Sequence, residues 1–319
     1  MKKLLAAVLA LCMVLSLASV SLAEPVAKVA ALKGPTAMGM VKMMKDDAGA
    51  TYDFNIHAAI DEITPRLVNG DVDIAAVPAN LASVLYNNTQ GKVKVLAVNT
   101  LGVLYIVENG NTVNSVEDLR GRTIFSAGQG ATPEYALNYV LSANGIDPAK
   151  DVTIQFGSEH SECLSLLLAN EGSVAMMPQP FVTTAQMKQE GIRIALDMNE
   201  EWAKLQEGNE NPSALLTGVV VGRTEFVENN PEVVNAFLES YKNSVAFTNE
   251  NVDEAAAIIG EYDIVPEAVA KKALPYCCIV CIDGAEMQTK LSGYLKVLFD
   301  QNPKSVGGAL PADDFYYSK

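Results

Sequence analysis

The residues that could carry out chemistry are few, and they lie in polar loops that follow apolar runs. Only two histidines occur, His57 and His160, and neither belongs to a doublet that could hold a metal ion. Ser158 and Ser161 flank His160, but no glycine-framed nucleophile elbow accompanies them. Cys163 beside His160 is disfavoured as a nucleophile because it follows the apolar pattern of a helix. We therefore predict a chain that binds a molecule and has no catalytic residue.

A second group of reactive side chains lies near the carboxyl terminus, where Cys277 and Cys278 are adjacent and Cys281 follows. The spacing superficially resembles a metal or redox cluster. However, these cysteines lie in an apolar, strand-like run, and buried free cysteine behaves as a small hydrophobic residue. No histidine or second cysteine pair completes a ligand set. We predict no metal and no cofactor, and leave the disulfide state of these cysteines open.

The amino terminus has the parts of a secretory signal peptide. Two lysines precede an apolar stretch over residues 4–20, and small residues follow it. The stretch is short for a membrane anchor and has no basic stop-transfer flank. Lipid anchoring at Cys12 is disfavoured because the bulky Leu11 fits a lipoprotein processing site poorly. We predict a signal peptide over residues 1–23, cleaved after Ala23, and a periplasmic or extracellular location.

Charge excludes some partners. The chain has 23 basic and 38 acidic residues, a formal net charge of −15, and loss of the two signal-peptide lysines would make it −17. An acidic balance of this size argues against nucleic acid and against anionic membrane surfaces as partners. No second long apolar run occurs, so we predict no stable membrane insertion after cleavage.

Behind the polar loops, strands and helices alternate. The strands read as continuous apolar runs, which indicates a parallel or mixed sheet covered on both faces. The predicted strands are 26–32, 52–57, 72–77, 93–98, 103–107, 122–126, 152–156, 174–177 and 214–221. A mainly helical tail follows, with helices predicted over 225–248, 253–262, 266–273 and 285–300. A tail this apolar must pack on another surface, and we place it on the first half of the fold.

A weak internal sequence repeat suggests that the fold has two similar halves. Residues 67–78 align without gaps to 167–178, and both segments run from helix end through turn and apolar strand to a proline. We predict an α/β fold of two three-layer αβα lobes joined by a two-segment hinge, with crossings near 107–113 and 211–216. Lobe I would comprise residues 24–109 and 215–319, and lobe II residues 110–214.

Several motifs together resemble a known family. They are ALKGPTAMG at 31–39, NGDVDIA at 69–75 before a proline, GQGATP at 128–133, NPKSVGG at 302–308 and DDFYY at 313–317. In this order they resemble ABC transporter substrate-binding proteins of the nitrate, sulfonate and thiamine-precursor (SsuA-like) group. The resemblance covers nearly all of the chain after the predicted signal peptide.

The resemblance implies a type II periplasmic-binding fold, with a ligand cleft between two lobes. It also implies a monomeric, cofactor-free protein that captures a small organic nutrient and delivers it to an ABC permease with its ATPase. Two alternatives stay open: an extracytoplasmic sensor that presents its solute to a receptor, and an enzyme on the same fold such as a pyrimidine-precursor synthase. Sparse basic residues in the loops argue against nitrate or phosphate alone and leave open whether one end of the solute is anionic.

Loops at the carboxyl ends of the strands are where open α/β sheets bind ligands. The strongest candidate is the loop 128–132, because glycines let backbone approach a ligand and N–H groups at a helix start attract negative charge. A plain strand-to-helix turn explains the same residues, and Glu134 in the first helical turn weakens an anion site. The predicted ligand-binding residues are Lys33, Gly34, Thr36, Met38, Ala59, Asp61, Asn80, Asn99, Thr100, Gly128, Gln129, Gly130, Ala131, Thr132, His160 and Gln179.

Several of these residues also have a purely structural interpretation. Lys33 could pair with an acidic solute or be a solvated rim lysine. Asp61 could meet an amine or only cap a helix, and Thr132 could contact the solute or cap one. His160 could bind the solute or lie on the surface before a helix. Phe181 could supply a stacking face or belong to the core.

Overall fold

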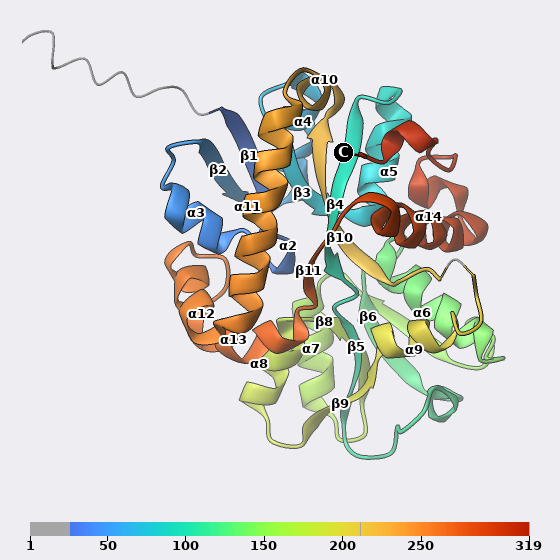
Figure 1. The fold of residues 1–319 in the computed structure, drawn as a ribbon. Coiled ribbons are helices and arrows are strands. Elements are labelled where there is room, and N and C mark those ends of the chain that lie inside the picture. Colours follow the sequence, from blue (N-terminus) through green and yellow to red (C-terminus); the bar gives the residue numbers. More distant parts are fainter. Residues whose placement is uncertain (1–25, 211, 319) are drawn as a thin grey trace, which may run out of the picture.

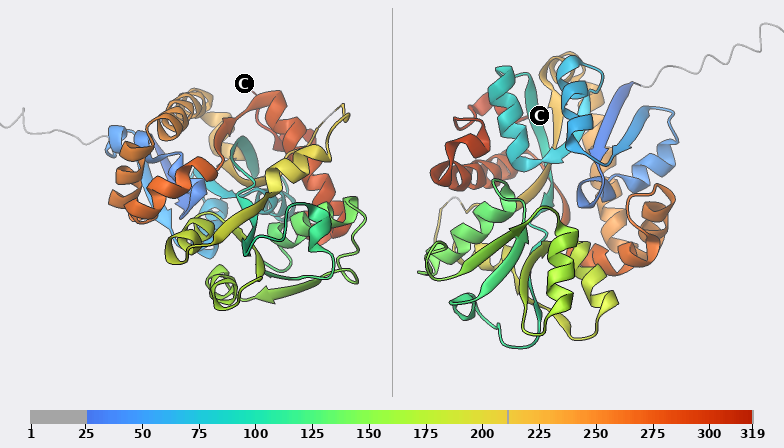
Figure 2. Two further views of the ribbon diagram at one scale, coloured as in Figure 1. Left: turned by 90° about the horizontal axis from the view of Figure 1, so that it is seen from below. Right: turned by 180° about the vertical axis from the view of Figure 1, so that it is seen from behind.

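The computed structural model describes residues 26–210 and 212–318, so the predicted signal peptide lies outside the described residues. The chain forms two bodies, each a sheet with helices on both faces (Figures 1 and 2). This mixed α/β architecture, with one six-stranded and one five-stranded sheet, confirms the predicted fold class.

The six-stranded sheet has the order β11-β4-β10-β3-β1-β2. β1 runs parallel to β2 and β3, whereas β10 runs antiparallel to both β3 and β4. β11 adds an antiparallel edge strand beside β4. The strands are β1 (Ala27–Leu32), β2 (Tyr52–His57), β3 (Ile74–Pro78), β4 (Val93–Leu101), β10 (Leu216–Arg223) and β11 (Ile279–Ile282).

The five-stranded sheet repeats this arrangement, with the order β7-β6-β8-β5-β9. β6 runs parallel to β7 and β8, and β5 runs antiparallel to β8 and β9. β3 and β8 are the strands of the two aligned segments. They occupy equivalent positions in the two sheets, as the internal sequence repeat predicts. The strands are β5 (Leu104–Asn109), β6 (Thr123–Ala127), β7 (Thr153–Gly157), β8 (Val174–Pro178) and β9 (Ile192–Asp197).

Helices cover each sheet on both faces, which is why the central strands β3 and β8 are apolar on every residue. In β8, Val174 and Met176 pack into one apolar cluster with α6, and Ala175 and Met177 pack into another with α7 and α8. The helices of this body are α6 (Thr132–Ala143), α7 (His160–Ala169), α8 (Phe181–Lys188) and α9 (Met198–Lys204).

The helical tail packs on the six-stranded body, as predicted. Phe237 and Tyr241 of α11 are fully buried in one cluster with Val29 of β1 and Met40. The helices of this body are α2 (Pro35–Met38), α3 (Val41–Asp47), α4 (Thr64–Asn69), α5 (Ala79–Thr89), α10 (Thr224–Asn229), α11 (Pro231–Glu250), α12 (Val252–Glu261), α13 (Glu267–Ala273) and α14 (Gly284–Gln301). Short 3-10 turns lie at Ile60–Glu62, Val116–Leu119, Leu274–Tyr276, Pro303–Val306 and Asp313–Phe315.

The first crossing between the bodies lies earlier than the predicted range 107–113. β5 belongs to the five-stranded sheet, so the chain leaves β4 at Leu101 and enters β5 at Leu104. At this point the two connecting segments lie side by side, because Gly102 N donates to Leu215 O at 2.7 Å. A Cβ on Gly102 would overlap the Leu215 side chain. We therefore propose a lobe boundary at Gly102 in place of the one at 109–110.

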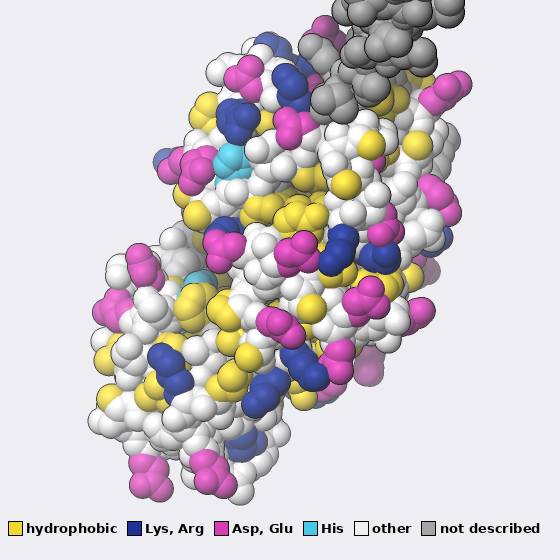
Figure 3. Space-filling view, turned by 90° about the vertical axis from the view of Figure 1, so that its left-hand side faces the viewer, with side chains coloured by type: hydrophobic (Ala, Val, Ile, Leu, Met, Phe, Trp, Pro, Cys, Tyr) yellow, Lys and Arg dark blue, Asp and Glu magenta, His cyan; other side chains and the backbone are white. Residues whose placement is uncertain are grey.

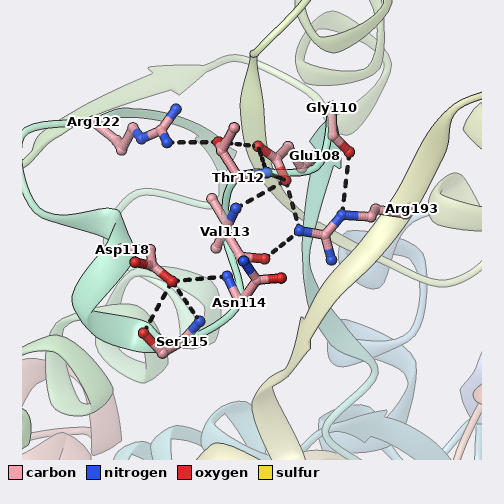
Figure 4. Close-up of polar contacts among 9 residues, drawn as sticks. All are labelled: Glu108, Gly110, Thr112, Val113, Asn114, Ser115, Asp118, Arg122 and Arg193. Atoms are coloured by element: carbon pink, nitrogen blue, oxygen red, sulfur yellow. Dashed lines mark hydrogen bonds and ion pairs between the residues drawn. The ribbon is translucent and has the colours of Figure 1, made fainter.

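A buried carboxylate organises the end of β5 that lies away from this crossing (Figure 4). Glu108 is fully buried and accepts hydrogen bonds from Thr112 N at 2.9 Å, Val113 N at 3.1 Å and Arg193 Nη2 at 2.8 Å. Arg193 Nε also donates to Gly110 O at 3.1 Å. Burial alone would raise the pKa of Glu108, but these hydrogen bonds outweigh it and hold the pKa below its ordinary value.

We expect Glu108→Gln to lower the free energy of unfolding by about 3 kcal/mol near neutral pH, because it leaves Arg193 without its buried partner. A carboxylate with a depressed folded-state pKa stabilises the fold above the ordinary pKa of 4.5 and loses this effect as pH falls below it. Urea unfolding should therefore show that the difference in free energy of unfolding between parent and variant becomes smaller at acidic pH.

Asp300→Asn provides the control, because Asp300 and Lys296 form an exposed i,i+4 pair on α14. Loss of this ion pair should lower the free energy of unfolding by less than about 1 kcal/mol. If both variants lowered the free energy of unfolding by the same small amount, the stabilising role given to Glu108 would be contradicted.

Candidate functional site

A cleft of about 290 Å³ lies between the two bodies and is lined by both. It lies at the carboxyl ends of β1, β3 and β8 and at the start of α6 and α7, which is where the topology rule places a ligand. Apolar side chains gather at the waist between the bodies in Figure 3. The lining residues are Leu32, Lys33, Pro35, Thr36, Pro78, Val103, Leu104, Thr132, Pro133, His160, Pro178, Gln179 and Thr217.

Larger hollows occur on the described surface but are poorer candidates. One of about 470 Å³ lies beside α3 and α11, and one of about 780 Å³ lies around Asn109 and Arg193. Each is lined by residues of a single body. A third hollow, of about 330 Å³ between α9 and α14, is also lined by both bodies, but none of its lining residues has a buried side-chain polar atom without a partner among the described residues. The cleft of about 290 Å³ is favoured because it joins the two bodies and is lined by Gln179 and His160, which have such atoms.

Gln179 is the most informative side chain in the cleft. It follows β8 and is only 2% exposed. Its Oε1 accepts from Thr183 N at 3.2 Å and from Thr183 Oγ1 at 2.8 Å. Because a backbone N–H can only donate, this contact fixes which end of the amide is oxygen. Nε2 is buried, and no described residue accepts its hydrogens.

His160 supplies a second polar atom without a partner. It begins α7, and its ring lies 5.3 Å from the Phe181 ring, centroid to centroid, with the planes tilted by 43°. Burial lowers the pKa of His160 below 6.5, so the ring is neutral near pH 7. Its Nδ1 is buried without a partner among the described residues. A neutral imidazole offers one donor and one acceptor.

Thr132 lies in the cleft wall and also bridges the two bodies. Its hydroxyl lies 2.8 Å from the hydroxyl of Tyr294 on α14, which packs on β4 and α5. The N-cap of α6 is Ala131, so the alternative that Thr132 caps this helix is wrong. Gln301 Nε2 adds a bridge to Tyr135 O at 3.0 Å. One flank of the cleft is thus closed by contacts between α6 and α14.

Thr36 lines the cleft, whereas two predicted ligand contacts lie behind it. Asn99 and Thr100 are fully buried; Asn99 Nδ2 donates to Thr36 O at 3.1 Å, and Thr100 Oγ1 donates to Asn99 Oδ1 at 3.0 Å. They position the turn at Thr36 and do not line the cleft. Gly218 of β10 completes this packing, because a Cβ there would overlap Asn99 Oδ1 and lie 2.6 Å from Thr36 Cγ2.

The remaining predicted contacts lie outside the cleft lining. Met38 is fully buried in the core, and Asn80 Nδ2 donates to Ser305 O at 3.3 Å. Asp61 is exposed within a 3-10 turn whose N-cap is Ala59, so it does not cap that turn. Residues outside the lining are Gly34, Met38, Ala59, Asp61, Asn80, Asn99, Thr100, Gly128, Gln129, Gly130 and Ala131.

The predicted residues that the cleft brings together are Lys33, Thr36, Thr132, His160 and Gln179. The prediction missed the apolar wall, above all the four prolines. Two of the four had a visible signal, since Pro78 and Pro178 end the two aligned segments and are the last residues of equivalent strands.

Three of the described cysteines, Cys163, Cys277 and Cys278, are not activated thiols. Burial raises the pKa of Cys163, Cys277 and Cys278, so each is a protonated thiol near pH 7. Among the described residues, no three His, Cys, Asp or Glu side chains are grouped so that they could hold a metal ion. Within the same part of the chain, every helix is too short or too polar to cross a bilayer.

Two α/β bodies around a shared cleft define a two-lobed solute-binding protein. A family model described as ABC transporter, phosphonate, periplasmic substrate-binding protein matches residues 37–238. The chain therefore belongs to this family of ABC importer substrate-binding proteins, as the motifs predicted.

Solved structures share the fold at low sequence identity. An ABC transporter structure from Parabacteroides distasonis is 23% identical, with a TM-score of 0.78 over 92% of this chain and 99% of that one. The aliphatic sulphonate binding protein SsuA of Escherichia coli is 14% identical, with a TM-score of 0.69 over 89% and 96%. The nitrate-binding protein NrtA of Synechocystis is 17% identical, with a TM-score of 0.56 over 79% and 70%. No curated protein matches the chain.

We expect Gly218→Ala to disturb the cleft from behind. The added methyl group would push Asn99 and Thr36 apart, and overpacking of this kind costs about 1–3 kcal/mol. Thermal unfolding should show this loss of stability as a lower melting temperature, and the variant should bind the protein's solute less tightly. A variant with unchanged stability and affinity would show that the Thr36 turn does not depend on this packing.

Proposed function

We propose that this ABC importer substrate-binding protein captures a small organic solute in the cleft between its bodies and delivers it to the permease. The observation that carries the proposal is the buried Gln179 amide, whose Nε2 has no acceptor among the described residues. Leaving such a donor unpaired costs about 1–3 kcal/mol, and a solute acceptor would remove that cost.

The size and walls of the cleft support a small solute with an apolar part. A volume of about 290 Å³ is near the lower end of the roughly 300–1,000 Å³ typical of small-molecule sites. Pro35, Pro78, Pro133 and Pro178 contribute apolar surface and no backbone N–H. Polar side chains line the cleft at only a few points, which are Lys33, Thr36, Thr132, His160, Gln179 and Thr217.

Closure of the two bodies follows from which residues line the cleft. Because both bodies contribute, a bound solute would interact with more protein when they are close together. It would shift the population toward the closed form by as much as its affinity for the two forms differs. The paired segments at Gly102 and Leu215 are where we place the hinge. We also propose that residues 1–23 direct export.

The alternatives have less support. Catalysis by Cys163 is disfavoured, because burial raises its pKa and leaves the thiol protonated. No contact of the described residues favours a sensor over a transport protein, whereas the family match favours transport.

We expect a thermal-shift screen of organic nutrients to find a solute that raises the melting temperature. Gln179→Leu keeps the approximate size of the side chain but removes the amide donor. It should weaken the affinity for that solute about 10- to 100-fold, as measured by calorimetric titration.

Gln155→Leu is the matched control, because Gln155 is an exposed glutamine on the edge strand β7. It should bind like the parent. Full affinity in Gln179→Leu, or a screen in which no solute stabilises the parent, would contradict the proposed site.

A further inference from the structure

Gln179 caps the helix that follows it. The N-cap of α8 is Pro180, which makes no side-chain hydrogen bond to the helix. The N–H groups of a first helical turn have no partner within the helix, and a side-chain oxygen near the N-cap usually accepts from one of them. Here the oxygen is Gln179 Oε1, which accepts at 3.2 Å from the N–H of Thr183, the third residue of α8.

This capping contact and one further hydrogen bond use the whole acceptor capacity of the amide. A carbonyl oxygen has two lone pairs. The backbone N–H of Thr183 occupies one, and Thr183 Oγ1, which donates at 2.8 Å, occupies the other. Thr183 is only 3% exposed, so its two contacts are shielded from bulk water. The Gln179 oxygen therefore has no lone pair left for a donor of a solute.

The same contacts disfavour the opposite orientation of the amide. A rotated amide would lose both hydrogen bonds and would place its NH2 group against the backbone N–H of Thr183, which is also a donor. The hydroxyl of Thr183 could accept from Nε2 instead, but the N–H could not. A buried N–H left without an acceptor is more costly than an exposed one. The backbone thus sets the orientation of the amide, and the hydroxyl strengthens it.

The nitrogen end of the amide has the opposite property. Nε2 is buried with two hydrogens, and no described residue accepts from it. Because Gln179 lines the cleft, this side chain can offer a solute only a donor. A carbonyl oxygen, a ring nitrogen or the oxygen of an anion can accept from it, so the charge of the acceptor is left open. A group that only donates, such as an ammonium, has no partner on this side chain.

We propose that Thr183 is the positioning residue that sets the specificity of the cleft at Gln179. It lies outside the cleft lining and acts through the amide, whose oxygen it occupies. The cleft therefore selects solutes with a hydrogen-bond acceptor at this point and rejects solutes with a donor-only group there. This rests on the proposed function, because it specifies how the same cleft recognises its solute.

Gln179→Glu tests the direction of the hydrogen bond. The probe is the compound of the nutrient screen that raises the parent's melting temperature most, titrated calorimetrically at about pH 8. The variant keeps an oxygen for Thr183, but its ionised carboxylate has no hydrogen to donate. Affinity should fall at least 10-fold, as in Gln179→Leu. Affinity equal to or above that of the parent in Gln179→Glu, together with a loss in Gln179→Leu, would overturn the proposed direction.

Cyclohexanone and cyclohexylamine join the screen as a pair with one skeleton. The ketone only accepts hydrogen bonds, and the ammonium form of the amine only donates them. Cyclohexanone should stabilise the parent saturably and Gln179→Leu less, whereas cyclohexylamine should show no difference between the two proteins. Stabilisation by cyclohexylamine that disappears in Gln179→Leu would contradict the selection of acceptors.

Thr183→Val tests the positioning role, because it keeps the shape of the side chain and removes the hydroxyl. The affinity for the probe should fall about 2- to 10-fold, since one of the two hydrogen bonds that hold the amide is lost. Thr183→Ser restores the hydroxyl and should bind like the parent. The matched control is Thr184→Val, because Thr184 Oγ1 donates to Pro180 O at 3.0 Å. Parent-like affinity in Thr183→Val, or an equal loss in Thr184→Val, would overturn the role of Thr183.

Nuclear magnetic resonance of the solute-free parent tests the orientation of the amide independently. A scalar coupling across the hydrogen bond should join the Thr183 amide nitrogen to the side-chain carbonyl carbon of Gln179, because the oxygen accepts. A missing coupling, with a strong nuclear Overhauser effect between the Gln179 NH2 group and the Thr183 amide proton, would overturn the proposal.

These measurements separate the two proposals. Weaker binding by both Gln179 variants supports the proposed function and the selection of acceptors. Weaker binding by Gln179→Leu alone keeps the proposed function and removes the selection. Equal affinity of the parent and Gln179→Leu removes the proposed function, and with it the specificity, even if the scalar coupling shows that Thr183 holds the amide.

Discussion

A buried amide with one end already occupied constrains what the cleft can bind. Thr183 holds the Gln179 oxygen through its backbone N–H and its hydroxyl, so rotation of the amide would lose two hydrogen bonds. The amide nitrogen is therefore the end of this cleft-lining side chain that has no partner among the described residues. The same cleft has apolar walls, formed in part by four prolines, and is also lined by His160, whose Nδ1 is likewise buried without a partner among the described residues.

The duplicated sheet topology brings these parts together. In each sheet three parallel strands lie beside an antiparallel one, and the carboxyl ends of β1 and β3 line the same cleft as that of β8. On the first side, Asn99 and Gly218 hold the Thr36 turn from behind. On the other side, β8 delivers Gln179, and Thr132 reaches Tyr294 across the flank. The cleft thus depends on packing within each body and on a few polar contacts between them.

The continuous apolar runs predicted both sheets, because strands covered on both faces leave a clear pattern. The loops after those strands also contained five residues that line the cleft, from Lys33 to Gln179. Asn99 and Thr100 misled the prediction, since a strand end does not reveal that its side chains turn into the core. The crossing was misplaced because β4 and β5 both contain apolar runs and only Gly102 and Val103 separate them.

The most direct test is a crystal structure of the chain with the solute that stabilises it. The account predicts a small organic solute between the two bodies, with a hydrogen-bond acceptor within hydrogen-bonding distance of Gln179 Nε2. A solute held outside this cleft, or one inside it that makes no hydrogen bond to Gln179, would contradict the account.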